Sequence, residues 1–437
     1  MEATTHAFVV LLFIVFFLGV GVWIFAGLVL VSFCSLYFIA DMPVMKIGYI
    51  VKGIFWQSSS SWELACIPLF LWMGEFILKT DISERLFNGL RPLLAWIPGG
   101  LIHTNVMGCT LFAAISGSSA ATVATVGKIT VGKLAEDGYD DRLSIGSIAG
   151  AGTLGLLIPP SIIMIVYGLL AEVSIARLFA AGLVPGLMVA LLYSLYIAIS
   201  CIARPELGPK QKIKISASEY RRSFINLFPV LLMITIVLGG IYSGVATPSE
   251  AAALGLAAAF VIAAVQRQLT WQIFRDSLMA SLRTSCMVIS IVVAASFMST
   301  AMAYLYVPQE LAKAIAGLGL GTLGLLLVLF VFYAVLGCFL EGISIVVMSL
   351  PIVLPMVVAA GLDVIWFGVF VVITVELAQV TPPVGINLFV LQGFTGRSIG
   401  TIAVAAIPFF LLLCVAAVLI SIWPQIVLWL PNLLYGA

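Results

Sequence analysis

Charged residues are scarce in this chain. Asp, Glu, Lys and Arg together make up 9% of its 437 residues, whereas hydrophobic residues make up 63%. A soluble domain of this length needs far more charge to cover its surface, so the composition excludes one. The net charge of +1 leaves no basic surplus of the kind that nucleic-acid binding requires.

Sequence patterns for metals and disulfides are missing as well. The seven cysteines stand singly in apolar segments without a CxxC pair, and the only histidines are His6 and His103. Zinc sites and redox pairs need such residues at close spacing. We therefore expect the cysteines to be buried packing residues, and we expect no cofactor.

Long uncharged runs take up much of the chain instead. Residues 7–40, 223–249, 284–309 and 398–437 contain no Asp, Glu, Lys or Arg. A helix needs roughly 20 apolar residues to cross the hydrocarbon core, and the strands of a membrane barrel alternate rather than run continuously apolar. The sequence predicts an all-α, multi-pass protein of the lipid bilayer.

The longest polar break divides the chain near its middle. Segment 204–222 carries six basic residues against two acidic ones, which indicates a cytoplasmic linker. It separates an N-terminal half, 1–203, from a C-terminal half, 223–437. Segment 128–142 carries both signs and is interpreted as a solvated turn.

A second polar segment, 79–93, has helical periodicity. Ile82, Leu86, Leu90 and Leu93 recur at near-helical spacing among charged residues. This pattern predicts an amphipathic arm at the membrane interface rather than a span. A plain connecting loop is the alternative.

Pro-Pro pairs occur in both halves, at Pro159-Pro160 and Pro382-Pro383. Aligning the two pairs defines a constant offset between the halves (382 minus 159). The same offset places Ser118 opposite Glu341, so each half has a small, glycine-containing polar element well before its Pro-Pro pair. Two coincidences at one offset favour an internal repeat.

Each Pro-Pro pair removes two backbone donors and prevents a helix from continuing into it. At membrane depth the freed carbonyls must be buried in protein or line a cavity with water or an ion. Interrupted helices in matching positions of two halves indicate the binding site of a secondary transporter. A proline kink repaired by neighbouring helices is the alternative.

Polar side chains near the first element suit a sodium ion. The hydroxyl oxygens of Ser116, Ser118 and Ser119 are hard ligands. Gly117 allows the backbone to turn between them. Close packing of small residues explains the same pattern equally simply.

Glu341 is isolated in a long uncharged stretch that runs from Lys313 to Asp363. A carboxylate inside a membrane is costly and normally marks an ion path or a paired charge, so we interpret Glu341 as a cation ligand. A position at the membrane surface is the alternative.

The N-terminus of a half-helix suits an anion and the C-terminus suits a cation. Both kinds of helix end are consistent with a carboxylate carried together with sodium.

Several stretches together resemble the large membrane subunit of tripartite ATP-independent periplasmic (TRAP) transporters of bacteria and archaea. They are Ser116-Gly-Ser-Ser119, Gly155-Leu-Leu-Ile-Pro-Pro-Ser161, Phe339-Leu-Glu341-Gly-Ile-Ser344, Leu350-Pro-Ile-Val-Leu-Pro355, Trp366-Phe-Gly368 and Thr381-Pro-Pro-Val-Gly385-Ile-Asn387. The likeness runs from about residue 10 to the end, in the family's order. Many members carry Asp where this chain has Glu341, so the carboxylate here is one methylene longer.

The resemblance implies an elevator-type fold with two inverted repeats in the inner membrane. Each repeat has a re-entrant helical hairpin, at about 101–127 and 325–358, and a Pro-Pro-broken helix, at about 144–170 and 364–394. It also implies sodium-coupled uptake of a small organic anion that a periplasmic substrate-binding protein delivers. A separate small four-helix membrane subunit completes the scaffold.

The ion- and substrate-binding residues that the resemblance and the residue chemistry predict lie at the two hairpin tips and the two breaks. They are Ser116, Gly117, Ser118, Ser119, Gly152, Thr153, Pro159, Pro160, Glu341, Gly342, Ser344, Thr381, Pro382, Pro383, Gly385 and Asn387. The candidate sodium ligands are Ser116, Ser118, Glu341 and Thr381.

Two other functions remain open from the sequence. A sodium symporter for divalent anions that works without a binding protein needs similar hairpin chemistry. An intramembrane hydrolase needs a serine with a histidine partner, but Gly117-Ser-Ser-Ala lacks the final glycine of the rhomboid pattern, and only His103 is available in an apolar segment. We expect a transporter rather than an enzyme.

Overall fold

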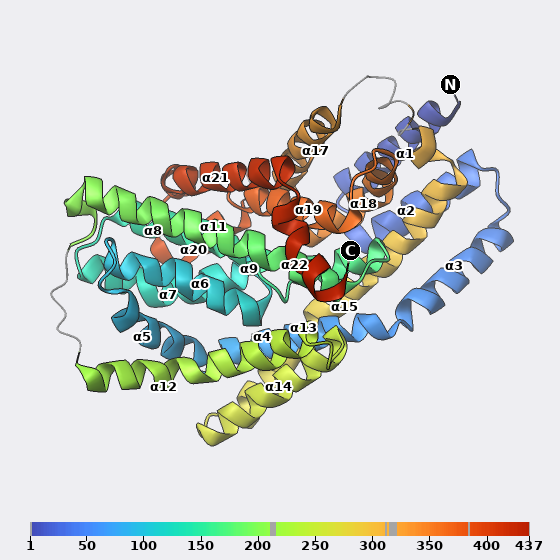
Figure 1. Cartoon of the computed structure of the whole chain (residues 1–437). Helices are drawn as coiled ribbons and strands as arrows, with labels where there is room; N and C mark the ends of the chain where they lie inside the picture. The colour runs from blue at the N-terminus through green and yellow to red at the C-terminus, as the bar shows by residue number, and fades with distance from the viewer. Residues whose placement is uncertain (1, 210–215, 311–312, 314–320, 383–384, 437) are drawn as a thin grey trace.

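Helices make up almost all of the structure, a computed structural model that describes residues 2–209, 216–310, 313, 321–382 and 385–436. Within these residues there is no strand, and the predicted all-α class is confirmed. Figure 1 shows long helices lying side by side, with α11 and α12 running across the left of the view and α15 running from the centre toward the upper right.

The helices that precede the basic linker are α1 (Glu2–Gly19), α2 (Ile24–Cys34), η1 (Ser35–Ile39), α3 (Val44–Ser59), η2 (Trp62–Ala65), α4 (Cys66–Leu78), α5 (Ile82–Leu94), η3 (Gly100–Ile102), α6 (His103–Ser116), α7 (Ser119–Glu136), α8 (Asp141–Gly152), α9 (Leu154–Leu157), α10 (Ile162–Leu170) and α11 (Ile175–Ala203).

The helices from the linker onward are η4 (Pro205–Leu207), α12 (Ala217–Ile234), η5 (Thr235–Gly239), α13 (Gly240–Tyr242), α14 (Pro248–Val265), α15 (Trp271–Tyr304), α17 (Thr322–Gly337), α18 (Gly342–Ala359), α19 (Val364–Gln379), α20 (Ile386–Thr395), α21 (Ile399–Ile422) and α22 (Gln425–Tyr435). Residues 210–215 of the linker lie outside the described part, and α12 begins with a capping box between Ser216 and Glu219.

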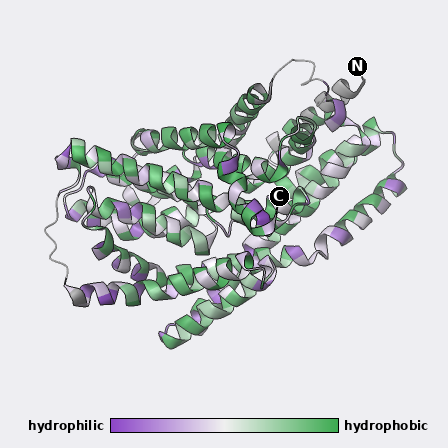
Figure 2. Cartoon of the chain, viewed as in Figure 1, coloured by the Kyte–Doolittle hydropathy of each residue, from purple (hydrophilic) through white to green (hydrophobic). Residues whose placement is uncertain are grey.

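Seven helical segments in the described chain are long and apolar enough to cross a membrane, or eight if the bent pair Val44–Ser59 with Trp62–Leu78 counts as one. Large apolar side chains on the outer helices, such as Leu191, Val261 and Leu411, stay exposed. Figure 2 shows apolar residues along most helices, with hydrophilic ones near the left-hand ends of α7, α11 and α12 and also along α3. This distribution suits a protein whose surroundings are lipid.

α5 covers the segment in which we predicted an amphipathic arm. Its Ile82, Leu86 and Leu90 are buried, and the helix packs against α12 and α6. Protein therefore covers this apolar face, and a location at the membrane interface stays a prediction.

The segment interpreted as a turn over 128–142 is mostly helical, because α7 continues to Glu136. Lys128 and Lys133 are exposed on one face, whereas Val126, Thr130 and Leu134 are buried on the other. The charges therefore lie on the outer face of a helix and do not end it. The turn itself is confined to residues 137–140.

Helix starts recur at the offset that separates the Pro-Pro pairs. α7 begins at Ser119 and α18 at Gly342, while α8 begins at Asp141 and α19 at Val364, and both differences (342 minus 119, 364 minus 141) equal that offset. Both α8 and α19 have an aspartate N-cap: Asp140 accepts the Leu143 N–H at 2.7 Å, and Asp363 accepts the Trp366 N–H at 2.8 Å. Local chain geometry is therefore similar in the two halves.

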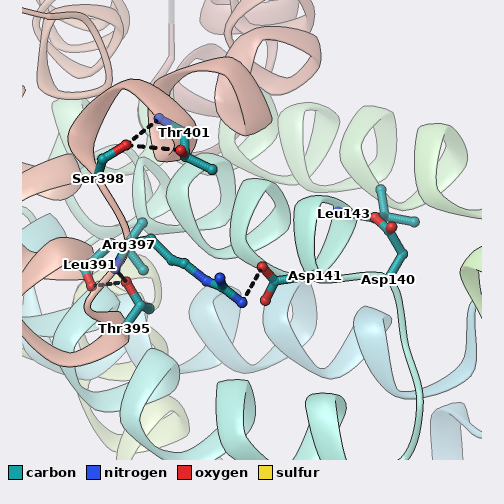
Figure 3. A network of polar contacts seen from close by, with 8 residues as sticks. All are labelled: Asp140, Asp141, Leu143, Leu391, Thr395, Arg397, Ser398 and Thr401. Atoms are coloured by element: carbon teal, nitrogen blue, oxygen red, sulfur yellow. Dashed lines mark hydrogen bonds and ion pairs between the residues drawn. The ribbon is translucent and has the colours of Figure 1, made fainter.

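A surface ion pair connects the loop after α20 with the start of α8. Arg397 Nη2 lies 2.9 Å from Asp141 Oδ2 (Figure 3). The next residue, Ser398, caps α21 by accepting the Thr401 N–H at 3.3 Å. This ion pair is one contact between the second half of the chain and the first, at the N-terminal end of α8.

Candidate functional site

The first hairpin tip is a tight turn between α6 and α7. Gly117 has φ +62°, in the left-handed region that favours glycine, and a Cβ there would lie 2.8 Å from the Pro160 carbonyl oxygen. Ser118 is the N-cap of α7, and its hydroxyl accepts the Ala121 N–H at 3.4 Å. The tip is therefore held against the first Pro-Pro pair.

The second hairpin tip lies between α17 and α18. Glu341 is the N-cap of α18, and the Ser344 hydroxyl donates to its carboxylate at 3.4 Å. Gly342 is buried, and a Cβ there would lie 3.1 Å from Gln379 Nε2 at the end of α19. The tip therefore packs close to the second break.

Both helices interrupted by prolines restart with a new N-terminus. After α9 the chain leaves the helix, and Ser161 caps α10 by accepting the Met164 N–H at 3.4 Å. After α19 the chain passes Thr381 and Pro382, and Gly385, with φ +32°, precedes α20. Pro383 lies outside the described residues.

A cavity of about 240 Å³ lies where these elements meet, and we call it the hairpin cavity. Its lining residues come from α4, both hairpin tips, both breaks and α15. They are Leu71, Gly74, Glu75, Leu78, Ser116, Gly117, Ser118, Ser119, Ala120, Ala121, Leu156, Ile162, Thr284, Met287, Glu341, Ile343, Gln379 and Ile386.

All charged residues in the described lining of the hairpin cavity are acidic. Glu75 and Glu341 line it, and no Lys, Arg or His does. Four helices, α7, α10, α18 and α20, place first-turn residues on its wall, and α6 and α19 end there with Ser116 and Gln379. First-turn N–H groups and last-turn carbonyls have no partner inside their helix, so the cavity wall offers both partial positive and partial negative charge.

Five of the predicted site residues line the cavity: Ser116, Gly117, Ser118, Ser119 and Glu341. They come from the two hairpin tips, which belong to opposite halves of the chain. The remaining described candidates, which are Gly152, Thr153, Pro159, Pro160, Gly342, Ser344, Thr381, Pro382, Gly385 and Asn387, are not among its lining residues.

The hydroxyls of the two predicted threonines bond to nearby protein atoms. Thr153 donates to the Gly150 carbonyl at 2.7 Å and lies 3.2 Å from the Tyr193 hydroxyl. Thr381 donates to the Leu377 carbonyl at 2.7 Å.

Asn387 is fully buried beside Gly152, and its amide has no hydrogen-bond partner among the described residues.

Glu376 of α19 is a buried carboxylate that the sequence did not place in the site. The Ser119 hydroxyl donates to its Oε1, and its Oε2 has no partner in the described part of the chain. The first hairpin tip is therefore connected directly to α19 of the other half.

Glu75, Thr284 and Gln379 are lining residues that sequence reasoning missed. Glu75 has a signal that was available: Leu71, Gly74, Glu75 and Leu78 lie at i, i+3, i+4 and i+7, on one face of α4. Glu75 is the only charged residue in α4. Thr284, in the middle of α15, and Gln379, at the end of α19, have no comparable signal, because single uncharged polar residues are common in helices.

His103, the histidine that a hydrolase would need, is not at the cavity. It is buried, and its Nε2 lies 2.9 Å from the Pro98 carbonyl oxygen. A multi-pass helical protein with two broken helices around a cavity lined by carboxylates and hydroxyls belongs to the class of membrane transporters.

The sequence matches the family described as the tripartite ATP-independent periplasmic transporter, DctM component, over residues 9–426. The chain belongs to this family of TRAP transporter large permeases, which are transporters rather than enzymes. The protein is accordingly a multi-pass protein of the inner membrane. The family also implies a tripartite system with a small membrane subunit and a periplasmic binding protein.

Two relatives from this family have names that print different substrates. The C4-dicarboxylate TRAP transporter large permease protein DctM of Pseudomonas aeruginosa is 36% identical, covering 86% of this chain and 88% of the relative. The sialic acid TRAP transporter large permease protein SiaM of Vibrio cholerae is 30% identical, covering 86% and 88%.

A solved structure has a similar fold. The YdaH transporter of Alcanivorax borkumensis superposes with a TM-score of 0.64 over 88% of this chain and 90% of that one, at 16% identity. The likeness concerns the fold alone.

Proposed function

We propose that this chain carries a small organic anion, together with sodium ions, through the hairpin cavity into the cell. The anion is a carboxylate such as a dicarboxylate, a sialic acid or a keto acid. A periplasmic substrate-binding protein delivers it, and a separate small four-helix membrane subunit completes the scaffold. Family membership supports this proposal over a symporter that works without a binding protein.

The observation that carries the proposal is the convergence of helix ends on a cavity without basic side chains. α7, α10, α18 and α20 all begin at its wall. The free N–H groups and the partial positive charge of each N-terminus attract an anion. The described lining has no other source of positive charge, so these four ends are the binding groups for a carboxylate.

The same wall provides ligands for sodium. The hydroxyls of Ser116 and Ser118 and the carboxylate of Glu341 are hard oxygen donors, and α6 and α19 end at the cavity with a partial negative charge. Thr381 remains a further candidate, because a hydroxyl that donates to a carbonyl keeps its lone pairs for a cation. A sodium ion beside Glu341 also offsets the charge of the substrate.

We propose an elevator movement for the transport step. The hairpins and broken helices, from two inverted repeats in 1–203 and 223–437, form the moving part, and α4 and α15 belong to the opposite wall. The recurrence of helix starts at the offset of the Pro-Pro pairs supports the repeat. Segment 204–222 joins the two halves.

Sodium-driven uptake in proteoliposomes tests the proposal, with the small subunit and the binding protein present. Glu341→Gln and Ser118→Ala should each lower uptake by at least about tenfold at limiting sodium, because each removes a direct cation ligand. Glu136→Gln, at the exposed end of α7, is the matched control and should transport normally. Normal uptake by both site variants at limiting sodium would show that the site is assigned wrongly.

A further inference from the structure

The C-terminal end of α19 contacts both hairpin tips. Glu376 is 0% exposed, and its Oε1 accepts a hydrogen bond from the Ser119 hydroxyl of the first tip. Val375 and Gln379 lie against the second tip, because a Cβ on Gly342 would lie 2.9 Å from Val375 Cγ1 and 3.1 Å from Gln379 Nε2. One helix therefore supports the tips of both halves of the chain.

Glu376 reaches the first tip from outside the hairpin cavity. It is not among the described residues that line the cavity, whereas its partner Ser119 is. A side chain that contacts a lining residue without lining the cavity itself acts on the contents of the cavity through the position of that residue.

Ser119 is connected to the serines that we propose as sodium ligands. It is the first residue of α7 and directly follows the N-cap Ser118. The Thr122 hydroxyl donates to the Ser118 carbonyl at 2.8 Å and lies 3.1 Å from the Ser116 hydroxyl. A shift of Ser119 therefore moves the oxygens of Ser116 and Ser118 as well.

We propose that Glu376 is a positioning residue for sodium binding. Its hydrogen bond to Ser119 holds the first tip on α19, and this contact fixes the oxygens of Ser116 and Ser118 relative to Glu341 of the second tip. The hydrogen bond, and not the charge of Glu376, has this effect. The proposal rests on the proposed function, because it takes the two tips as the sodium site.

The sodium dependence of uptake in proteoliposomes tests this role, with the small subunit and the binding protein present. Glu376→Met removes the acceptor, and Ser119→Ala removes the donor. Each should raise the sodium concentration for half-maximal uptake by about tenfold or more, the usual effect of losing a group that orients an ion ligand. Uptake at saturating sodium should stay within about twofold, because high sodium overcomes weak binding.

The double variant shows whether the two residues act through one contact. Glu376→Met combined with Ser119→Ala should impair sodium dependence no more than the more impaired single variant, because both changes remove the same hydrogen bond. If the two effects multiply instead, the residues act independently and the proposal is overturned.

Glu376→Gln separates the hydrogen bond from the charge. Glutamine has nearly the same shape, and its amide can pair with the Ser119 hydroxyl through either the oxygen or the nitrogen. This variant should keep the sodium dependence of the natural sequence within about twofold. A Glu376→Gln variant as impaired as Glu376→Met would show that the charge itself binds an ion, which contradicts a positioning role.

Thr374→Val is the matched control on the same helix. Thr374 is buried, and its hydroxyl donates to the carbonyls of Phe370 and Val371 within α19. Its replacement should leave the sodium dependence unchanged. The proposal fails if Thr374→Val is as impaired as Glu376→Met, or if Glu376→Met has the natural sodium dependence.

Melting in detergent shows whether each variant is folded before uptake is measured. If Glu376→Met does not fold, Ser119→Ala and Glu376→Gln decide the question. Ser119→Ala should then lose sodium affinity while Glu376→Gln keeps it, and the reverse result overturns the proposal.

Glu341→Gln distinguishes failure of this proposal from failure of the proposed function. If Glu341→Gln raises the sodium concentration for half-maximal uptake and Glu376→Met does not, only the role of Glu376 is wrong. If Glu341→Gln has no effect, the sodium site itself is wrong.

Discussion

At the scale of single residues, Gly155 of α9 lies directly against the first hairpin tip. A Cβ at this position would lie 2.6 Å from Ser119 Cα and 2.7 Å from the Ser119 nitrogen. These are backbone atoms, which cannot move aside without shifting the tip. The close approach of the broken helix to the hairpin therefore depends on the absence of a side chain.

Gly155→Ala should destabilise the protein by about 1–3 kcal/mol and strongly reduce uptake, because the tip must shift away from the break. Melting in detergent and uptake in proteoliposomes measure the two effects. Gly132→Ala in α7 is the matched control: nothing lies within 4 Å of its Cβ position, and alanine favours a helix by up to about 1 kcal/mol. Equal melting temperatures for the two variants would contradict the packing argument.

Single residues also show how far the sequence predicts the site. Glu341 and the serines of the first tip were recognisable, because a carboxylate and hydroxyls are unusual in apolar runs, and they line the cavity. Glu75 was missed because it stands one helical turn from Lys79 and resembles an ordinary helix-end charge. The spacing of Leu71, Gly74, Glu75 and Leu78 places them on one helix face, and the packing of α4 on the first tip shows that this face lines the cavity.

At the scale of elements, the ion pair between Arg397 and Asp141 joins the α20–α21 loop to α8 (Figure 3). The two side chains are 54% and 45% exposed, so water screens their attraction. The pair orients these elements and contributes little to stability.

Arg397→Ala should lower the free energy of unfolding by less than about 1 kcal/mol. A double-mutant cycle with Asp141→Ala, followed by melting in detergent, isolates the interaction. A coupling well above that value would mean that the pair is shielded from water in the assembled transporter.

Elements whose ends have strong local signals were predictable. The prolines indicated both breaks, and the uncharged runs indicated the spans. The end of α7 was not, since the charged face of a helix and a solvated turn have the same composition. The buried spacing of Val126, Thr130 and Leu134 distinguishes the two once neighbouring helices are in place.

At the scale of the whole molecule, the proposed sodium site predicts a specific effect on stability. A ligand that binds only the folded state stabilises it by about 2.7 kcal/mol at a hundred times its dissociation constant. Sodium should therefore raise the melting temperature of the permease with its small subunit, whereas choline at the same ionic strength should not. Equal melting in the two salts would argue against sodium as the coupling ion.

The helix ends at the hairpin cavity have a consequence for how such a carrier changes its cargo over evolution. In the proposed site, attraction to negative charge comes from helix N-termini of the main chain rather than from basic side chains among the described lining residues. Point mutations in the other side chains that line the hairpin cavity can then alter which acid binds without removing the electrostatic attraction for a carboxylate. On this proposal, a change of substrate does not require a new source of positive charge in the cavity.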